Sequence, residues 1–310
     1  MVSSQDLADL VERVLRCAVT LIECDAVGGS NATYFVQLVT GEDIVVRVAR
    51  PEIADLLVQE IWAMDQCRAQ GVPTPEILHF EIASEGFPES YVIMRRLPGV
   101  PAHLIPLTPG RREGVLEQLG YHLAHVHQVR LTGFGGLVAT SRGYSGRYHS
   151  AGDYLLAELG ERATRLPKEV LPRAQVAKLQ TRLEAGRLIV DPTEPVLIHG
   201  DYHFKNVLVQ DGRVTGIVDF ENLVAGDPVL DFKDIHLRST WPDSDLRALQ
   251  RGYGRPDLFD DRFWAKLYLY EVPRLLEILN WHVRLRNLED IAASLSQLSQ
   301  IEATLREILR

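Results

Sequence analysis

The apolar residues of this 310-residue chain change their spacing part-way along, and that change restricts the fold more than any other feature. Early in the chain, two β-rich runs, 33–39 and 44–49, are joined by a short turn-forming linker and predict an antiparallel hairpin. After Thr108–Pro109, a pair typical of a helix start, nearly every segment has the apolar period of a helix. We therefore predict an α+β fold of two lobes, with a small antiparallel-sheet lobe over residues 1–96 and a larger, mainly helical lobe over residues 97–310.

The composition excludes several classes of protein. Hydrophobic residues make up 46% and charged residues 24% of the chain, and no stretch approaches the roughly 18 consecutive apolar residues of a membrane span. The 42 acidic and 33 basic residues give a net charge of −9, the wrong sign for binding nucleic acid. The three cysteines form no CxxC pair, which argues against a disulfide framework or a zinc site. We expect a cytoplasmic protein with no membrane or nucleic-acid partner. The apolar stripe of the last helix is core or a dimer face, so monomer and homodimer both remain open.

The segment from His199 to Glu221 contains the residues that indicate chemistry. Four residues separate Asp201 from Asn206, and Asp219 follows Asn206 by thirteen residues, with short β-type runs between and around them. Phosphoryl transfer needs a carboxylate that orients the attacking hydroxyl, plus an amide and a second carboxylate that hold Mg²⁺. Each residue alone is equally well explained as a turn or a cap, but the three together at this spacing favour a phosphotransferase.

This segment resembles the HGDxHxxN catalytic loop and the D-F/W-E metal motif of the aminoglycoside phosphotransferase and choline kinase superfamily, whose two-lobed fold is protein-kinase-like. The resemblance implies that Asp201 is the catalytic base, that Asn206 and Asp219 bind Mg²⁺, and that ATP or GTP is the phosphoryl donor. It also implies that His203 forms an orienting hydrogen bond.

The same resemblance extends into the first lobe, with Gly28–Asn31 as the nucleotide loop and Met94–Leu97 as the hinge whose backbone meets the base. Arg47 stands where kinases usually carry a phosphate-binding Lys, with Glu60 as its partner and Arg50 as another candidate cation. The implied nucleotide-binding residues are Gly28, Gly29, Ser30, Asn31, Arg47, Glu60, Met94, Arg95 and Leu97.

The acceptor is expected to be a small molecule, because the segment from Glu221 to Pro228 leaves little room for the activation loop of a protein kinase. The glycine-rich order at 133–136, followed by a predicted loop to Tyr148, is similar to hygromycin phosphotransferases and favours an aminoglycoside-like antibiotic or a related hydroxylated metabolite, cationic compounds included. A kinase of choline-, homoserine- or sugar-like compounds and a nucleotide-binding pseudokinase remain alternatives. The candidate acceptor contacts are Asp201, His203, Glu221, Asp231, Trp241 and Glu271.

Overall fold

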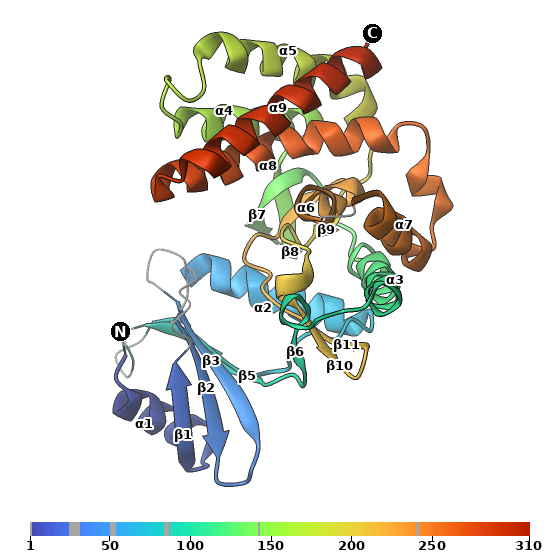
Figure 1. Ribbon diagram of the computed structural model, residues 1–310. Coiled ribbons are helices and arrows are strands. Elements are labelled where there is room, and N and C mark those ends of the chain that lie inside the picture. The colour runs from blue at the N-terminus through green and yellow to red at the C-terminus, as the bar shows by residue number, and fades with distance from the viewer. Residues whose placement is uncertain are drawn as a thin grey trace. The chain divides into compact units, whose positions relative to one another are not determined.

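A computed structural model of the chain describes residues 2–24, 32–49, 54–83, 87, 89–141, 143–239 and 242–310 (Figure 1). The chain divides into two compact units, which are Met1–Thr108 with Phe204–Glu221, and Pro109–His203 with Asn222–Arg310. This division differs from the single boundary predicted at residue 97, because the segment 204–221 packs with the first unit although it comes much later in the chain.

The first unit is built on a five-stranded sheet in the order β1-β2-β3-β5-β4, in which every neighbouring pair is antiparallel. The predicted hairpin is formed by β2 and β3, and the predicted strand at 91–94 lies within β5, so the antiparallel-sheet prediction is confirmed. The strands are β1 (Val19–Cys24), β2 (Ala32–Leu38), β3 (Asp43–Ala49), β4 (Ile77–Glu81) and β5 (Ser90–Arg95).

Two helices accompany this sheet. Helix α1 (Ser4–Leu15) begins at a side-chain cap from Ser3 and buries Leu7, Leu10 and Val11 against the sheet. Because strand side chains alternate between faces, Val46 points into this core while Arg47 points the other way, where it contacts Glu60 of α2 (Ala54–Ala69).

A second, three-stranded sheet in this unit has the order β11-β10-β6, from β6 (Val100–Pro101), β10 (Val207–Gln210) and β11 (Arg213–Ile217). The turn between β10 and β11 has positive φ at Asp211 and Gly212, which matches the twist of a tight hairpin. The pairing of Val207 with Ile217 brings the start of β10 next to the end of β11.

The second unit is mainly helical, and in it α4, α5, α8 and α9 pack together. Helix α9 lies along α8 and buries Leu298, Ile301 and Leu305 of its apolar stripe in the core, whereas Ile308 of the same stripe is exposed. The helices are α3 (Pro109–Val126), α4 (Ala151–Thr164), α5 (Arg173–Val190), α6 (Lys233–Arg238), α7 (Pro242–Tyr253), α8 (Phe263–Leu285) and α9 (Leu288–Ile308), with short 3-10 turns η4 (Pro228–Phe232) and η5 (Pro256–Phe259). Among the described helices, none is both long and apolar enough to cross a membrane.

A four-stranded sheet in the order β8-β7-β12-β9 completes this unit, from β7 (Phe134–Thr140), β8 (Gly143–Tyr148), β9 (Val196–Ile198) and β12 (Val224–Gly226). The prediction of a loop up to Tyr148 was wrong, because β7 and β8 form an antiparallel hairpin there. The glycines hide the alternation that marks a strand, and they also let the two strands approach each other closely. A Cβ at Gly146 would lie 2.3 Å from the backbone nitrogen of Phe134.

Candidate active site

The first unit contains a pocket of about 370 Å³, within the size range of small-molecule sites. Strand alternation directs Phe35, Val45 and Arg47 toward it, since the residues between them point into the core under α1. The pocket is lined by seven of the residues that the sequence nominated, namely Arg47, Met94, Arg95, Leu97, Asn206, Asp219 and Glu221.

The predicted hinge, Met94–Leu97, begins in the last residues of β5, and two of its backbone N–H groups already donate hydrogen bonds within the protein. The backbone N–H of Arg95 donates to the carbonyl oxygen of Glu76 at 2.9 Å, and that of Arg96 donates to Asp43 at 3.1 Å. In the described part of the chain, the backbone N–H of Leu97 has no acceptor. Among Arg95, Arg96 and Leu97, it is therefore Leu97 whose N–H can donate to a nucleobase.

Arg47 connects the sheet to α2 and to Asp219. Its Nη1 lies 2.6 Å from Oε1 of Glu60, a side chain only 2% exposed, and its Nη2 lies 3.8 Å from Oδ1 of Asp219. Burial alone would lower the pKa of Arg47, but the carboxylates of Glu60 and then Asp219 outweigh it and raise that pKa above its ordinary value. Arg47 is thus a permanent cation on the pocket wall, suited to binding phosphate.

Asn206 and Asp219 stand at the two ends of the β10–β11 hairpin. The backbone N–H of Val218 donates to the carbonyl oxygen of Asn206 at 3.0 Å, which closes the hairpin between them. Asp219 has a φ of 70°, in the left-handed region that few residues other than glycine adopt. Amide and carboxylate oxygens are the donors that Mg²⁺ prefers, and Mg²⁺ in nucleotide sites commonly takes one or two protein ligands plus phosphate oxygens. This donor pair fits that ion, whereas the described residues hold no group of three or more His, Cys, Asp and Glu arranged for a metal.

Replacing Arg47 with methionine is expected to lower the free energy of unfolding by about 2 kcal/mol, because the buried Glu60 carboxylate loses a charge-assisted hydrogen bond. Urea unfolding of Arg47→Met, Arg47→Lys and Arg47→Met/Glu60→Gln measures this effect. Arg47→Lys keeps the charge and should lose less, and the double variant should regain part of the loss because no unpaired carboxylate remains. If Arg47→Met unfolds at the urea concentration of the unmodified protein, this account of the pair is wrong.

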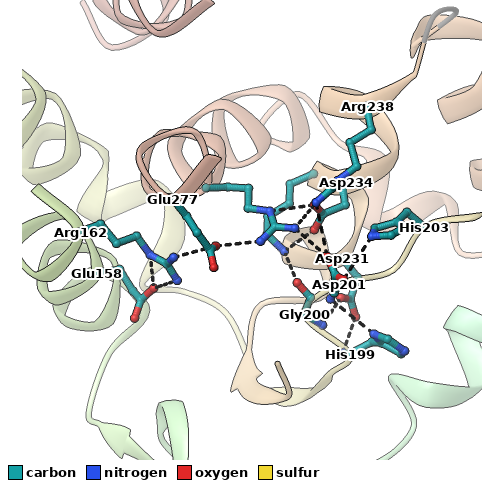
Figure 2. A network of polar contacts seen from close by, with 12 residues as sticks. Glu158, Arg162, His199, Gly200, Asp201, His203, Asp231, Asp234, Arg238 and Glu277 are labelled. Atoms are coloured by element: carbon teal, nitrogen blue, oxygen red, sulfur yellow. Dashed lines mark hydrogen bonds and ion pairs between the residues drawn. The ribbon is translucent and has the colours of Figure 1, made fainter. Parts of the chain in front are cut away.

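In the second unit, Asp201 lies in a network of charged side chains (Figure 2). Its Oδ1 is 2.6 Å from Nη2 of Arg274 and 3.7 Å from Nη2 of Arg238, and its Oδ2 is 3.1 Å from Nε2 of His203. Burial alone would raise the pKa of Asp201, but the hydrogen bond from His203 and the charges of His203, Arg274 and Arg238 hold it well below the usual range. The carboxylate is therefore ionised at neutral pH, and it is still 17% exposed.

Asp231, a fully buried side chain, holds the backbone that carries Asp201. Its Oδ2 accepts from the backbone N–H of His199 at 2.9 Å, and its Oδ1 accepts from that of Gly200 at 2.8 Å. Gly200 has a φ of 86°, and a Cβ there would lie 2.0 Å from the carbonyl oxygen of Asn222, so the loop requires glycine at this position. Lys233 donates to the carbonyl oxygen of Gly200 at 3.0 Å, which holds the next peptide, between Gly200 and Asp201.

The remaining nominated residues are distributed as follows. Glu271 is fully buried, so its carboxyl group faces the interior, where Oε1 lies 2.5 Å from Nδ1 of His236. This burial raises the pKa of Glu271. Gly28–Asn31, Arg50 and Trp241 lie outside the described residues.

Arg274 and Arg238 are the site residues that sequence reasoning missed. Arg274 lies in the middle of α8, and its contact with Asp201 spans 73 positions of the sequence. A single arginine in an amphipathic helix has the same local signature as a solvent-exposed one. No local sequence pattern could have identified Arg274. The largely buried carboxylate of Asp201 needs a cationic partner, but the sequence does not indicate which arginine or lysine supplies it.

Comparison with known proteins places this geometry in context. Residues 23–270 match the model of the phosphotransferase enzyme family. A homoserine kinase of Pseudomonas aeruginosa is 29% identical over 211 residues, which are 65% of this chain and 59% of that protein. The chain thus spans less than two thirds of the length of that curated relative.

Among solved structures, the ternary complex of the aminoglycoside phosphotransferase APH(4)-Ia with ADP and hygromycin B has a TM-score of 0.72 at 20% identity, covering 95% of this chain and 97% of that one. The macrolide 2′-phosphotransferase MphH from Brachybacterium faecium has a TM-score of 0.63 at 18% identity, with 94% and 95% coverage. These likenesses establish the fold, and the predicted kinase-like fold class is confirmed.

Proposed function

The chain belongs to the phosphotransferase enzyme family, a family of small-molecule phosphotransferases, and we propose that it transfers the γ-phosphoryl group of ATP or GTP to a hydroxyl group of a small molecule. The observation that carries this proposal is the Asp201 carboxylate, which is held ionised by His203 and Arg274 and is still partly exposed. The ADP bound in the APH(4)-Ia complex supports an adenine nucleotide as the donor.

The pocket of the first unit would hold the nucleotide. Its apolar side chains, among them Val45, Met94 and Leu208, would contact the base, and the N–H of Leu97 would donate to it. Arg47 would bind phosphate oxygens. Asn206 and Asp219 would hold Mg²⁺, which when bound neutralises charge on the β- and γ-phosphates.

Asp201 would accept a hydrogen bond from the acceptor hydroxyl, align its oxygen with the γ-phosphorus and take its proton as the new P–O bond forms. Its low pKa suits this role, since in phosphoryl transfer orientation contributes more than the strength of the base. The bond from the γ-phosphorus to the bridging oxygen breaks, and the nucleoside diphosphate leaves.

We propose an aminoglycoside-like acceptor, in line with the layout of the chain and with APH(4)-Ia. A second candidate class, hydroxylated amino acids such as homoserine, is favoured by Arg238, whose side chain is 39% exposed beside Asp201 and could pair with a carboxylate. The homoserine kinase relative supports this second class. Asp231 would position the loop rather than contact the acceptor, because both of its oxygens already accept hydrogen bonds.

Mass spectrometry of reaction mixtures tests the proposal directly. The purified protein is incubated with Mg²⁺, ATP or GTP, and a panel of aminoglycosides, macrolides, choline, homoserine and sugars. We expect one acceptor to gain the mass of a phosphoryl group with the unmodified protein and to gain nothing with Asp219→Ala. Nucleotide binding without modification of any acceptor would instead support a pseudokinase.

A further inference from the structure

The guanidinium of Arg274 contacts three carboxylates at once. Its Nη2 lies 2.6 Å from Oδ1 of Asp201, its Nε lies 2.8 Å from Oδ1 of Asp234, and its Nη1 lies 2.7 Å from Oε2 of Glu277. The side chain is only 9% exposed. A planar fork with all three nitrogens engaged in a largely buried setting has one orientation available to it.

This arrangement also fixes the rotation of the Asp201 carboxylate. Arg274 holds Oδ1 and His203 holds Oδ2, so turning the carboxylate would break a hydrogen bond on each side. The exposed part of the Asp201 carboxylate is therefore available to a ligand in one fixed orientation. Arg238 approaches Oδ1 to 3.7 Å, too far for a hydrogen bond, and cannot hold that oxygen in the same way.

Further ion pairs keep Arg274 itself in place (Figure 2). Glu277 lies 2.7 Å from Nη1 of Arg162 in α4, and Arg162 is paired with Glu158 at 2.5 Å. On the other side, Lys233 lies 3.0 Å from Oδ2 of Asp234. Within these residues each guanidinium or ammonium group lies against at least one carboxylate, so the network carries few uncompensated charges.

We propose that Arg274 is a positioning residue for phosphoryl transfer, which holds Asp201 in the orientation that aligns the acceptor hydroxyl. The proposal rests on the function proposed above, in which Asp201 contacts the acceptor. The reacting oxygen and the γ-phosphorus must be aligned within a fraction of an ångström, and a misplaced acceptor costs far more rate than affinity.

Two substitutions separate the charge of Arg274 from its shape. With the acceptor found in the mass-spectrometric panel, Arg274→Lys, which keeps the charge but loses the planar fork, is expected to lower kcat about 10-fold to 100-fold with an unchanged KM for nucleotide. Arg274→Gln should lower kcat at least as much and should also move the acid limb of the kcat–pH profile to higher pH, because the pKa of Asp201 rises when the cation is removed. A purely structural role would lower the urea midpoint of both variants and leave kcat and the pH profile where they were, which would overturn the proposal.

A measurement without turnover keeps this proposal separate from the proposed function. In protein carrying ¹³C-labelled aspartate, with the Asp201 carboxylate signal assigned by its loss in Asp201→Asn, Arg274→Gln should shift the Asp201 titration to higher pH. The matched control is Arg182→Gln, which breaks another partly buried Arg–Glu pair, with Glu302, and should leave that titration unchanged. An Asp201 signal that titrates identically in Arg274→Gln and unmodified protein overturns the assignment, whatever the panel shows. If the titration shifts but no acceptor is phosphorylated, the contact holds and the proposed function fails.

Discussion

Asp201→Asn is expected to lower kcat by about 10²-fold to 10⁴-fold, the effect typical of removing a group that orients and deprotonates a reacting hydroxyl. Asparagine has nearly the same shape, so its oxygen can still accept from Arg274, but it cannot take the proton. The loss should appear in kcat, whereas the dissociation constant for nucleotide should stay within about twofold, since the pocket proposed to bind nucleotide is formed by residues of the first unit.

Steady-state kinetics and calorimetric titration of nucleotide check this expectation together. The control is Asp257→Asn, which removes the same charge from an exposed pair with Arg255 and should leave both values unchanged. Turnover by Asp201→Asn within about twofold of the unmodified enzyme would contradict the role of Asp201. Since the pKa of Asp201 lies below its usual range, protonation of this residue should not limit kcat between pH 5 and 8.

The sequence predicted those parts of the molecule that depend on neighbouring residues. Alternating apolar runs indicate the β2–β3 hairpin, and the short runs around Asn206 and Asp219 indicate the β10–β11 hairpin that carries them. The residues before Tyr148 form a hairpin where a loop was expected. The sequence did not indicate these strands, because glycines hide the alternation of apolar and polar residues that marks a strand.

The parts that depend on distant residues could not be predicted. The occupied N–H groups of Arg95 and Arg96 follow from strand pairing, which the sequence of the hinge does not encode. In the same way, the burial of Asp231 and Glu271 is decided by tertiary packing. The sequence alone therefore nominated both as acids that could contact the acceptor. Arg274 is the clearest case, since only the assembled unit places it against Asp201.

Replacing Asp231 with asparagine is expected to lower the free energy of unfolding by about 3–5 kcal/mol, the cost of breaking a buried charged network. Its two carboxylate oxygens accept from the backbone N–H groups of His199 and Gly200, and Oδ2 also lies 3.0 Å from Nε2 of His127. An asparagine side chain has one oxygen, so its NH₂ group must face a backbone N–H in either orientation, leaving donors opposed in a fully buried site.

Urea unfolding at several pH values tests this explanation. Burial alone would raise the pKa of Asp231, but His127 above all outweighs it and lowers that pKa, so the ionised carboxylate stabilises the fold above its unfolded pKa of about 3.9. The stability difference between the unmodified protein and Asp231→Asn should therefore be full near neutral pH and should narrow as the pH falls below about 4.

A graded control identifies the network as the cause. Tyr253→Phe removes the hydroxyl that lies 2.9 Å from Nδ1 of His127, one contact away from Asp231, and should cost about 1 kcal/mol with no such dependence on pH in the acid range. Because Asp231 holds the peptides on either side of His199, just before Asp201 in the chain, Asp231→Asn should also lower kcat more than Tyr253→Phe does. An unfolding free energy for Asp231→Asn within about 0.5 kcal/mol of the unmodified protein would mean that other contacts hold the loop of Asp201.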